Sequence, residues 1–222
     1  RHIMKNKIII FLIILTSCST EKKNLIIEGE INGVKNSKIY LLIADDGIIM
    51  DSTNVIDGKF NLKTFLDEPK EISLILENIN SKNKFDFITE PTNILFTSSK
   101  DKFVFNGKIK NSKLYSEFIT IDNQINKFDE KDLELLAKQI EFSVKADQKK
   151  YDSLNKERIK INQKKILFIV NHSINNNSSP VSAFIIHKYK KSINKNYIEK
   201  VYNNFSDEIK DSYYGKKLVF NP

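Results

Sequence analysis

Cys18 is the only cysteine of the 222-residue chain, and its position gives its thiol a chemical use. It follows the uninterrupted apolar run of residues 8–15 and the two small residues Thr16 and Ser17. Small side chains let a peptidase approach the backbone, and the thiol is a nucleophile that can accept lipid. This spacing therefore indicates processing at Cys18 rather than catalysis.

The segment Leu15-Thr16-Ser17-Cys18 resembles the bacterial lipobox. The resemblance implies diacylglyceryl transfer to the Cys18 thiol, cleavage before Cys18 and acylation of the new amino group. Each buried CH2 of an acyl chain adds ~0.8 kcal/mol of membrane affinity, so several chains anchor stably. The alternative is an ordinary signal peptide with a chance cysteine.

The residues before the lipobox have the pattern of an export signal. Residues 1–3 precede Met4 and indicate a tag remnant or a mis-set start. Lys5 and Lys7 supply a short positive region before the apolar run. That run is well below the ~20 residues that span a bilayer. We therefore expect residues 1–17 to be tag remnant and signal peptide, and residues 18–24 to be a lipidated tether.

Other catalytic chemistry finds little support in the sequence. Once Cys18 is lipidated, no thiol remains for disulfides, thiol catalysis or zinc–thiolate binding. His172 and His187 lie fifteen residues apart without an adjacent acidic motif, and we interpret both as structural. We predict no catalytic residue, no metal site, no cofactor and no enzymatic activity.

We interpret the charged residues as turn residues and as solvent-exposed surface residues. Asp45, Asp46 and Asp51 lack the alternating oxygen spacing of a calcium loop and favour turns. The formal net charge is +8, or +5 once the residues before Cys18 are removed. Lysine-rich stretches such as 149–150 and 188–191 favour a solvated helix face over contact with anionic lipid. Because export is expected, nucleic acid is excluded as a partner.

Two hydrophobic periods divide the rest of the chain, which predicts an α+β fold. Residues 25–108 show short β-branched runs separated by turn residues, typical of an antiparallel β-sandwich or barrel-like domain. Residues 109–222 are predicted to form an all-helical region. The expected strands are 25–31, 38–44, 50–55, 59–63, 71–76, 84–89, 92–97 and 102–105. The expected helices are 112–127, one long or broken helix over 129–172, 180–191, 196–204 and 207–213, the last ended by Gly215, with residues 166–170 buried throughout.

The chain also resembles a known family. It is similar to the domain of unknown function at the N-terminus of thioredoxin-like lipoproteins of the thiol–disulfide interchange and AhpC/TSA type, together with the helical region that follows it. The motifs that carry this resemblance are Gly29-Glu-Ile-Asn-Gly33, Lys38-Ile-Tyr-Leu41, Asp51-Ser-Thr53, Asp57-Gly-Lys-Phe60, Phe168-Ile169, Ser179-Pro-Val-Ser-Ala183 and Ser212-Tyr-Tyr-Gly-Lys-Lys-Leu218.

The resemblance leaves two function classes open. In that family a thioredoxin-like domain with reactive cysteines follows, whereas this sequence stops at Pro222, so the redox activity has no residue to rest on. The first expectation is a non-enzymatic envelope lipoprotein, a binding or scaffold module for an unknown ligand or a periplasmic protein partner. The alternative is the accessory half of a thiol–disulfide redox system whose thioredoxin-like domain is separate or lost.

The residue after the anchor bears on the location. Ser19 stands where inner-membrane retention in some Gram-negative bacteria calls for Asp, and Glu21 alone does not make the acidic cluster that marks surface export. We therefore expect the periplasmic face of the outer membrane, with the membrane as a partner through the lipid anchor.

Overall fold

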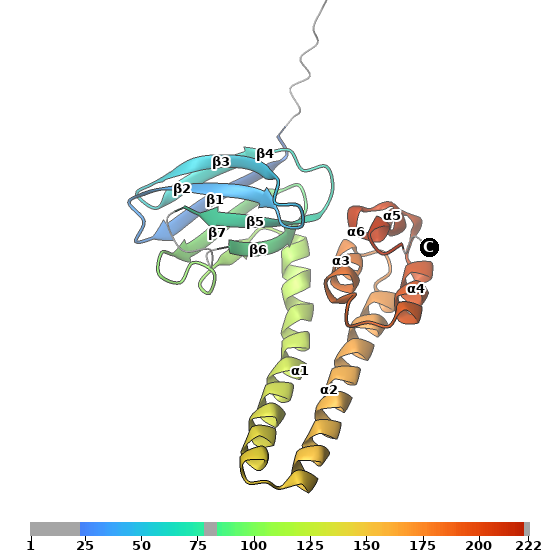
Figure 1. Cartoon of the computed structure of the whole chain (residues 1–222). Coiled ribbons are helices and arrows are strands. Elements are labelled where there is room, and N and C mark those ends of the chain that lie inside the picture. The colour runs from blue at the N-terminus through green and yellow to red at the C-terminus, as the bar shows by residue number, and fades with distance from the viewer. Residues whose placement is uncertain (1–22, 78–83, 220–222) are drawn as a thin grey trace, which may run out of the picture.

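The computed structural model describes residues 23–77 and 84–219, and it has two parts (Figure 1). A curled sheet over residues 25–110 is followed by a helical region, which confirms the α+β class. In Figure 1, the long helices α1 (Lys113–Val144) and α2 (Gln148–Asn175) form a hairpin that leaves the sheet and returns to a cluster of short helices beside it.

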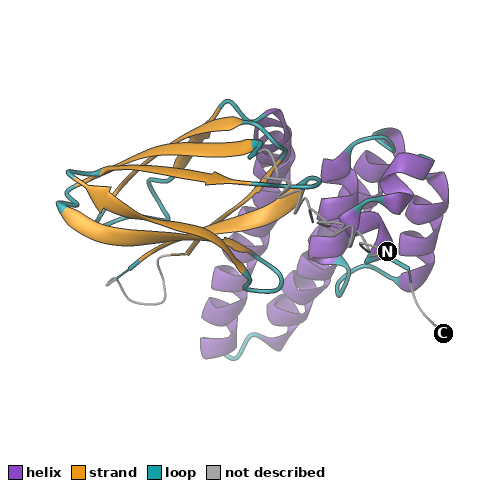
Figure 2. Cartoon of the chain, turned by 90° about the horizontal axis from the view of Figure 1, so that it is seen from above, coloured by secondary structure: helices purple, strands orange, loops and turns teal. Residues whose placement is uncertain are grey.

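The sheet contains eight strands in the order β6-β5-β2-β3-β4-β1-β7-β8. Its halves face each other across the core (Figure 2), as expected of a sandwich or barrel-like domain. It is mixed rather than wholly antiparallel, because β1 and β7 run parallel. The strands are β1 (Leu25–Asn32), β2 (Asn36–Ile43), β3 (Ile49–Ile56), β4 (Lys59–Thr64), β5 (Lys70–Leu76), β6 (Lys84–Thr89), β7 (Asn93–Ser99) and β8 (Lys108–Lys110).

Strands β3 and β4 mark the corner where the two halves of the sheet meet. Their tight turn places Asp57 and Gly58 at φ 47° and 80°, the left-handed region that Asp-Gly turns favour. Ladder pairing between the strands is limited to Ile56 and Lys59, so they splay apart. Further along, Asp51 bridges them, because its carboxylate accepts hydrogen bonds from the backbone N–H of Ser52 (2.8 Å) and Lys63 (2.9 Å).

The strand expected over 102–105 is wrong, since this segment is a turn. Ser98 donates its hydroxyl hydrogen to the Phe103 carbonyl (2.6 Å), and the Phe103 ring packs on Phe96 in the sheet core. Residues 102–105 resemble a strand in composition because this turn carries the buried aromatic side chain of Phe103. The last strand, β8, lies a few residues later.

Two long helices form the hairpin, α1 (Lys113–Val144) and α2 (Gln148–Asn175). The predicted boundary near 127–129 is wrong, because α1 continues through it. The break lies at 145–147, where Ala146 adopts a positive φ of 53° and Asp147 caps α2 by accepting from the Lys150 N–H (3.1 Å). Residues 145–147 contain neither Gly nor Pro, so no strong helix-breaking signal marks this turn.

Four short helices follow α2 within the described residues. They are α3 (Pro180–Tyr189), α4 (Lys195–Asn204), α5 (Asp207–Asp211) and α6 (Tyr213–Lys216). The predicted single helix over 207–213 is wrong, because Ser212 ends α5 and caps α6. Gly215 lies inside α6 rather than after it, where a Cβ would overlap the Ile209 carbonyl oxygen.

The two parts share a junction at β6 and the start of α1. Consecutive β6 residues point to opposite faces, so Phe87 lies in the sheet core and Ile88 in the helical core. Tyr115 packs against both cores. At the N-terminus of α1, the Glu90 carboxylate accepts from the Lys113 N–H (2.7 Å), which suits the positive end of a helix.

Across the described ranges 23–77 and 84–219, no helix combines the length and apolar composition needed to cross a bilayer.

Candidate functional site

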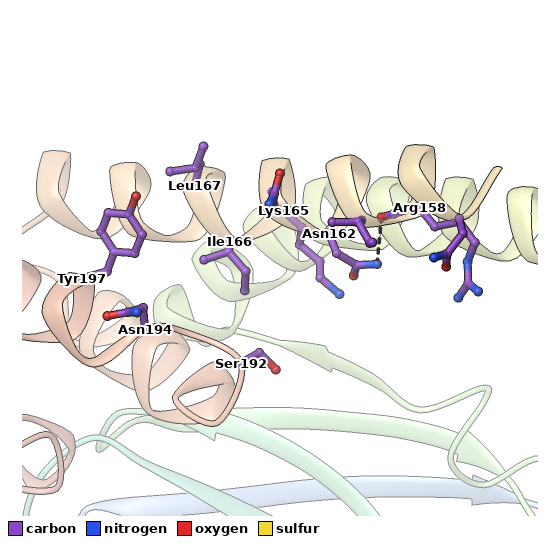
Figure 3. A pocket seen from close by; sticks show the side chains of 11 residues that line it. Arg158, Asn162, Lys165, Ile166, Leu167, Ser192, Asn194 and Tyr197 are labelled. Carbon is purple, nitrogen blue, oxygen red and sulfur yellow. Dashed lines mark hydrogen bonds between the residues drawn. The ribbon is translucent and has the colours of Figure 1, made fainter. Parts of the chain in front are cut away.

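A groove of about 640 Å3 lies between α2 and the α3–α4 connection with the start of α4 (Figure 3). In Figure 3, Tyr197 rises from α4 toward α2, and Ile166 points from α2 toward the loop that carries Ser192 and Asn194. The lining residues are Asn155, Arg158, Ile159, Asn162, Gln163, Lys165, Ile166, Leu167, Ser192, Asn194 and Tyr197. From Asn155 to Leu167 the groove follows roughly 18 Å of helix.

Both cations of the groove are neutralised by carboxylates of α1. Arg158 makes a two-pronged ion pair with Asp132 (2.8 and 3.0 Å) and donates to the Gln139 side chain (2.9 Å). The hydrogen bond from Arg158 lowers the pKa of Asp132, so that carboxyl stays ionised. Lys165 pairs with Asp129 at 2.6 Å. The charges therefore join the two long helices, and the groove attracts neither anions nor cations strongly.

The groove offers apolar surface and amide groups to a ligand. Ile159, Leu167 and Tyr197 leave 51%, 43% and 41% of their surface exposed. The side-chain amides of Asn155 and Gln163 form no hydrogen bond within the part of the chain that the structure describes. This arrangement suits an elongated, uncharged ligand that packs one side on the apolar residues and exchanges hydrogen bonds with the amides.

A second polar cluster joins the sheet to the helical region. Asp45, in the β2–β3 turn, pairs with Lys217 (2.6 Å), and Lys217 donates to the Tyr213 hydroxyl (2.6 Å). His187 of α3 faces the same carboxylate, with its Nε2 atom 3.6 Å away. The hydroxyl of Tyr213 also lies 3.3 Å from Asp46.

Burial changes the pKa values of His187 in this cluster and of Tyr214 beside it. Burial lowers the pKa of His187, so its neutral form is favoured, and its buried Nδ1 atom has no hydrogen-bond partner in the described structure. Burial raises the pKa of Tyr214, whose hydroxyl accepts from the Glu71 N–H (2.8 Å). The cluster has the properties of a structural joint, because each of its charges is used in a contact between the two parts.

The predicted site residues Leu15, Thr16, Ser17 and Cys18 lie outside the described residues, so lipidation stays a prediction. His172, on α2, contacts Asn176 and Phe168 and does not belong to the joint around Asp45. Among the described residues, no group of three or more His, Cys, Asp or Glu side chains is placed to hold a metal ion.

Sequence reasoning missed both the groove and the joint. Residues 166–170 were predicted to be buried throughout, yet Leu167 is exposed in the groove. Asp45 and His187 meet across 142 residues, and no local motif encodes such a contact. The one available signal was the Ser212–Leu218 motif, which supplies Tyr213, Tyr214 and Lys217 to the joint.

The fold defines an α+β protein in which a curled mixed sheet precedes a helical hairpin with a compact helical end. Residues 25–118 match the family model described as Domain of unknown function (DUF4369), so a DUF4369 domain is present there. The match covers the sheet and continues into the first turns of α1. Comparisons with curated proteins and with solved structures found no match.

Proposed function

We propose that this chain is a lipid-anchored, non-enzymatic binding protein of the cell envelope, and that the α2–α4 groove holds its ligand. The groove carries the proposal, because its cations are already paired while its apolar and amide groups are open to solvent. The segment Leu15-Thr16-Ser17-Cys18 supports the anchor. The ligand class that fits is an elongated uncharged segment, such as an extended peptide of a periplasmic protein.

The arrangement of the chain fits such a role. The chain enters the sheet at the start of β1, on the side away from the tip of the α1–α2 hairpin (Figure 1). An anchor just before Lys23 would leave the hairpin and the groove projecting from the membrane. Ser19 after the anchor favours the outer membrane, with the protein on its periplasmic face.

The anchor is tested by metabolic labelling with an alkyne palmitate. The wild-type chain should incorporate label, and Cys18→Ala should lose it and leave the membrane fraction. Label that persists on Cys18→Ala would contradict the anchor. Added protease should digest the protein only after the outer membrane is permeabilised, and digestion in intact cells would place it on the surface.

The groove is tested by photocrosslinking in cells, with a benzophenone amino acid at Gln163. We expect a discrete adduct that is lost when Ile159→Arg blocks the groove. The same crosslinker at Lys138, on exposed α1 surface, is the matched control. Equal adducts at both positions, or an adduct unaffected by Ile159→Arg, would rule out the groove as the binding site.

The second candidate is the accessory half of a thiol–disulfide redox system. It is favoured by the DUF4369 domain, since the chain resembles lipoproteins in which such a domain accompanies a thioredoxin-like one. Thiol–disulfide exchange needs an attacking thiolate, so the purified mature chain alone should not reduce insulin. Stimulation of a thioredoxin-like protein encoded immediately downstream would favour this candidate over the first.

A further inference from the structure

The end of the β3–β4 pair opposite its tight turn, termed here the apolar corner, carries exposed apolar side chains near the point where the chain enters the sheet. Ile48, Ile49 and Phe65 leave 56%, 59% and 40% of their surface exposed. Phe65 and Met50 line one shallow hollow with Lys23, and Ile48 and Ile49 directly precede Met50. Exposed apolar residues that lie close together on a protein surface commonly mark an interaction site.

Hydrogen bonds fix this corner to the entering chain. Asn24 donates its backbone N–H to the Thr64 carbonyl (3.1 Å), and its side chain both donates to and accepts from the backbone of Leu66 (2.9 and 2.8 Å). The Thr64 hydroxyl reaches the Met50 carbonyl at 3.5 Å, which links β4 to β3. The apolar corner therefore has a fixed position relative to Lys23.

Two lysines lie at the apolar corner and suit the phosphates of a lipid surface. Lys23 and Lys63 line the hollow beside Asp51, whose carboxylate accepts hydrogen bonds from two backbone N–H groups. In the preceding turn, Asp45 is paired with Lys217 and Asp46 contacts the Tyr213 hydroxyl. The ammonium groups of Lys23 and Lys63 beside the apolar residues can pair with the phosphates of lipid headgroups.

The short length of chain between Cys18 and Lys23 indicates that the apolar corner lies close to the membrane that holds the anchor. Cys18 stands five residues upstream, and five residues reach at most ~18 Å when fully extended. We propose that Ile48, Ile49 and Phe65, with Lys23 and Lys63, form a membrane-contact face that rests on the lipid bilayer and orients the hairpin away from it. This inference rests on the proposed anchor at Cys18.

A membrane-contact face fixes the orientation of the protein on the bilayer, which a flexible tether alone does not do. With one fixed face on the bilayer, the α1–α2 hairpin keeps a constant direction, and the groove stays at a constant height. The lysine-rich part of α2 then projects away from the lipid, so its charge serves solubility rather than membrane binding. Apolar side chains combined with lysines are the usual composition of surfaces that lie in the headgroup region.

The test supplies the anchor artificially, so that its result does not depend on lipidation in cells. The mature chain from Ser19, with an N-terminal hexahistidine tag, is attached to phosphatidylcholine–phosphatidylglycerol vesicles that contain a nickel-chelating lipid. This form lacks Cys18, so Ile49→Cys creates a single thiol for an environment-sensitive dye. Val144→Cys, at the exposed end of α1, is the matched control.

We expect the dye at position 49 to shift to the blue and to be quenched by brominated lipid, and the dye at position 144 to do neither. Equal responses, or a response only at position 144, would overturn the proposal. A response at position 49 that needs protein concentration but no vesicles would assign the corner to a second copy of the chain and overturn it too. Far-UV circular dichroism verifies that both labelled variants are folded.

A second measurement uses the chain without a tag. Binding to anionic vesicles should fall about tenfold in the Ile48→Ser/Ile49→Ser variant, because two exposed apolar side chains no longer leave water. Leu133→Ser/Val144→Ser, which removes exposed apolar surface from α1, should bind as the wild type does. Equal losses in both variants would contradict a dedicated face. Failure of palmitate labelling at Cys18 would instead remove the anchor and leave these vesicle results standing.

Discussion

His187 shows how burial at a single residue makes stability depend on pH. Burial lowers its pKa below the ordinary value of 6.5, so the unfolded chain binds more protons than the folded chain as the pH falls. The contribution of neutral His187 to the free energy of unfolding is complete above pH 6.5 and is lost progressively below it. Burial raises the pKa of Glu71, which acts in the opposite direction at lower pH.

We therefore expect His187→Gln to flatten the fall in the free energy of unfolding between pH 7.5 and about 6. Urea denaturation at several pH values, followed by circular dichroism, measures this slope. Burial lowers the pKa of His172 as well, so His172→Gln should flatten the slope separately and the double variant should flatten it more. An unchanged slope in His187→Gln would show that its imidazole titrates normally.

Asp51 belongs to a motif that is visible in the sequence, but its structural role could not be predicted from that motif. Its carboxylate replaces missing ladder bonds at the splayed β3–β4 corner. Asp51→Ala leaves two backbone N–H groups without this acceptor, and we expect it to lower the free energy of unfolding by about 1–2 kcal/mol. Asp101→Ala, in an exposed turn, is the control and should change stability little. Equal denaturation midpoints for the two variants would contradict this role.

At the scale of elements, alternation of apolar residues predicted seven of the eight strands closely, because one face of each strand packs on the core. Predictions failed where a local signal was weak or misleading. The Phe103 turn has the composition of a strand, and the Ala146 turn carries neither Gly nor Pro. The parallel pairing of β1 with β7 depends on chain topology, which periodicity does not encode.

The hairpin of α1 and α2 depends on contacts between the helices more than on either helix alone. Arg158 contacts both Asp132 and Gln139 on α1, and its guanidinium and the Asp132 carboxylate are largely shielded from water. Arg158→Ala should lower the free energy of unfolding by about 1–2 kcal/mol and speed hydrogen exchange over residues 129–144. Lys131→Ala removes an exposed pair with Glu134 and should have almost no effect. Similar effects of both substitutions would mean that Arg158 does not fasten the hairpin.

At the scale of the whole molecule, the sheet and the helical end meet through residues far apart in the sequence. Tyr214 is almost fully buried, its ring packs on Phe184 and His187, and its hydroxyl accepts from the backbone of Glu71. The Glu68 carboxylate accepts from the Tyr213 N–H (2.6 Å). Periodicity predicted both parts of the chain, but it could not place the last helix against β5.

These contacts predict that Tyr214 makes the two parts unfold together. Tyr214→Ala removes a buried aromatic ring from the joint, and we expect it to cost about 3–5 kcal/mol and to separate unfolding into two transitions. Tyr214→Phe keeps the ring and loses only the hydroxyl, so it should cost about 1 kcal/mol and leave one transition. Hydrogen exchange read by mass spectrometry should show early opening of residues 207–218 in Tyr214→Ala, while β1 and β7 stay protected. If β1 and β7 open together with residues 207–218 in Tyr214→Ala, the junction of β6 with α1 is enough to couple the unfolding of the two parts. Tyr214 would then be a contact between the parts and not the cause of their cooperative unfolding.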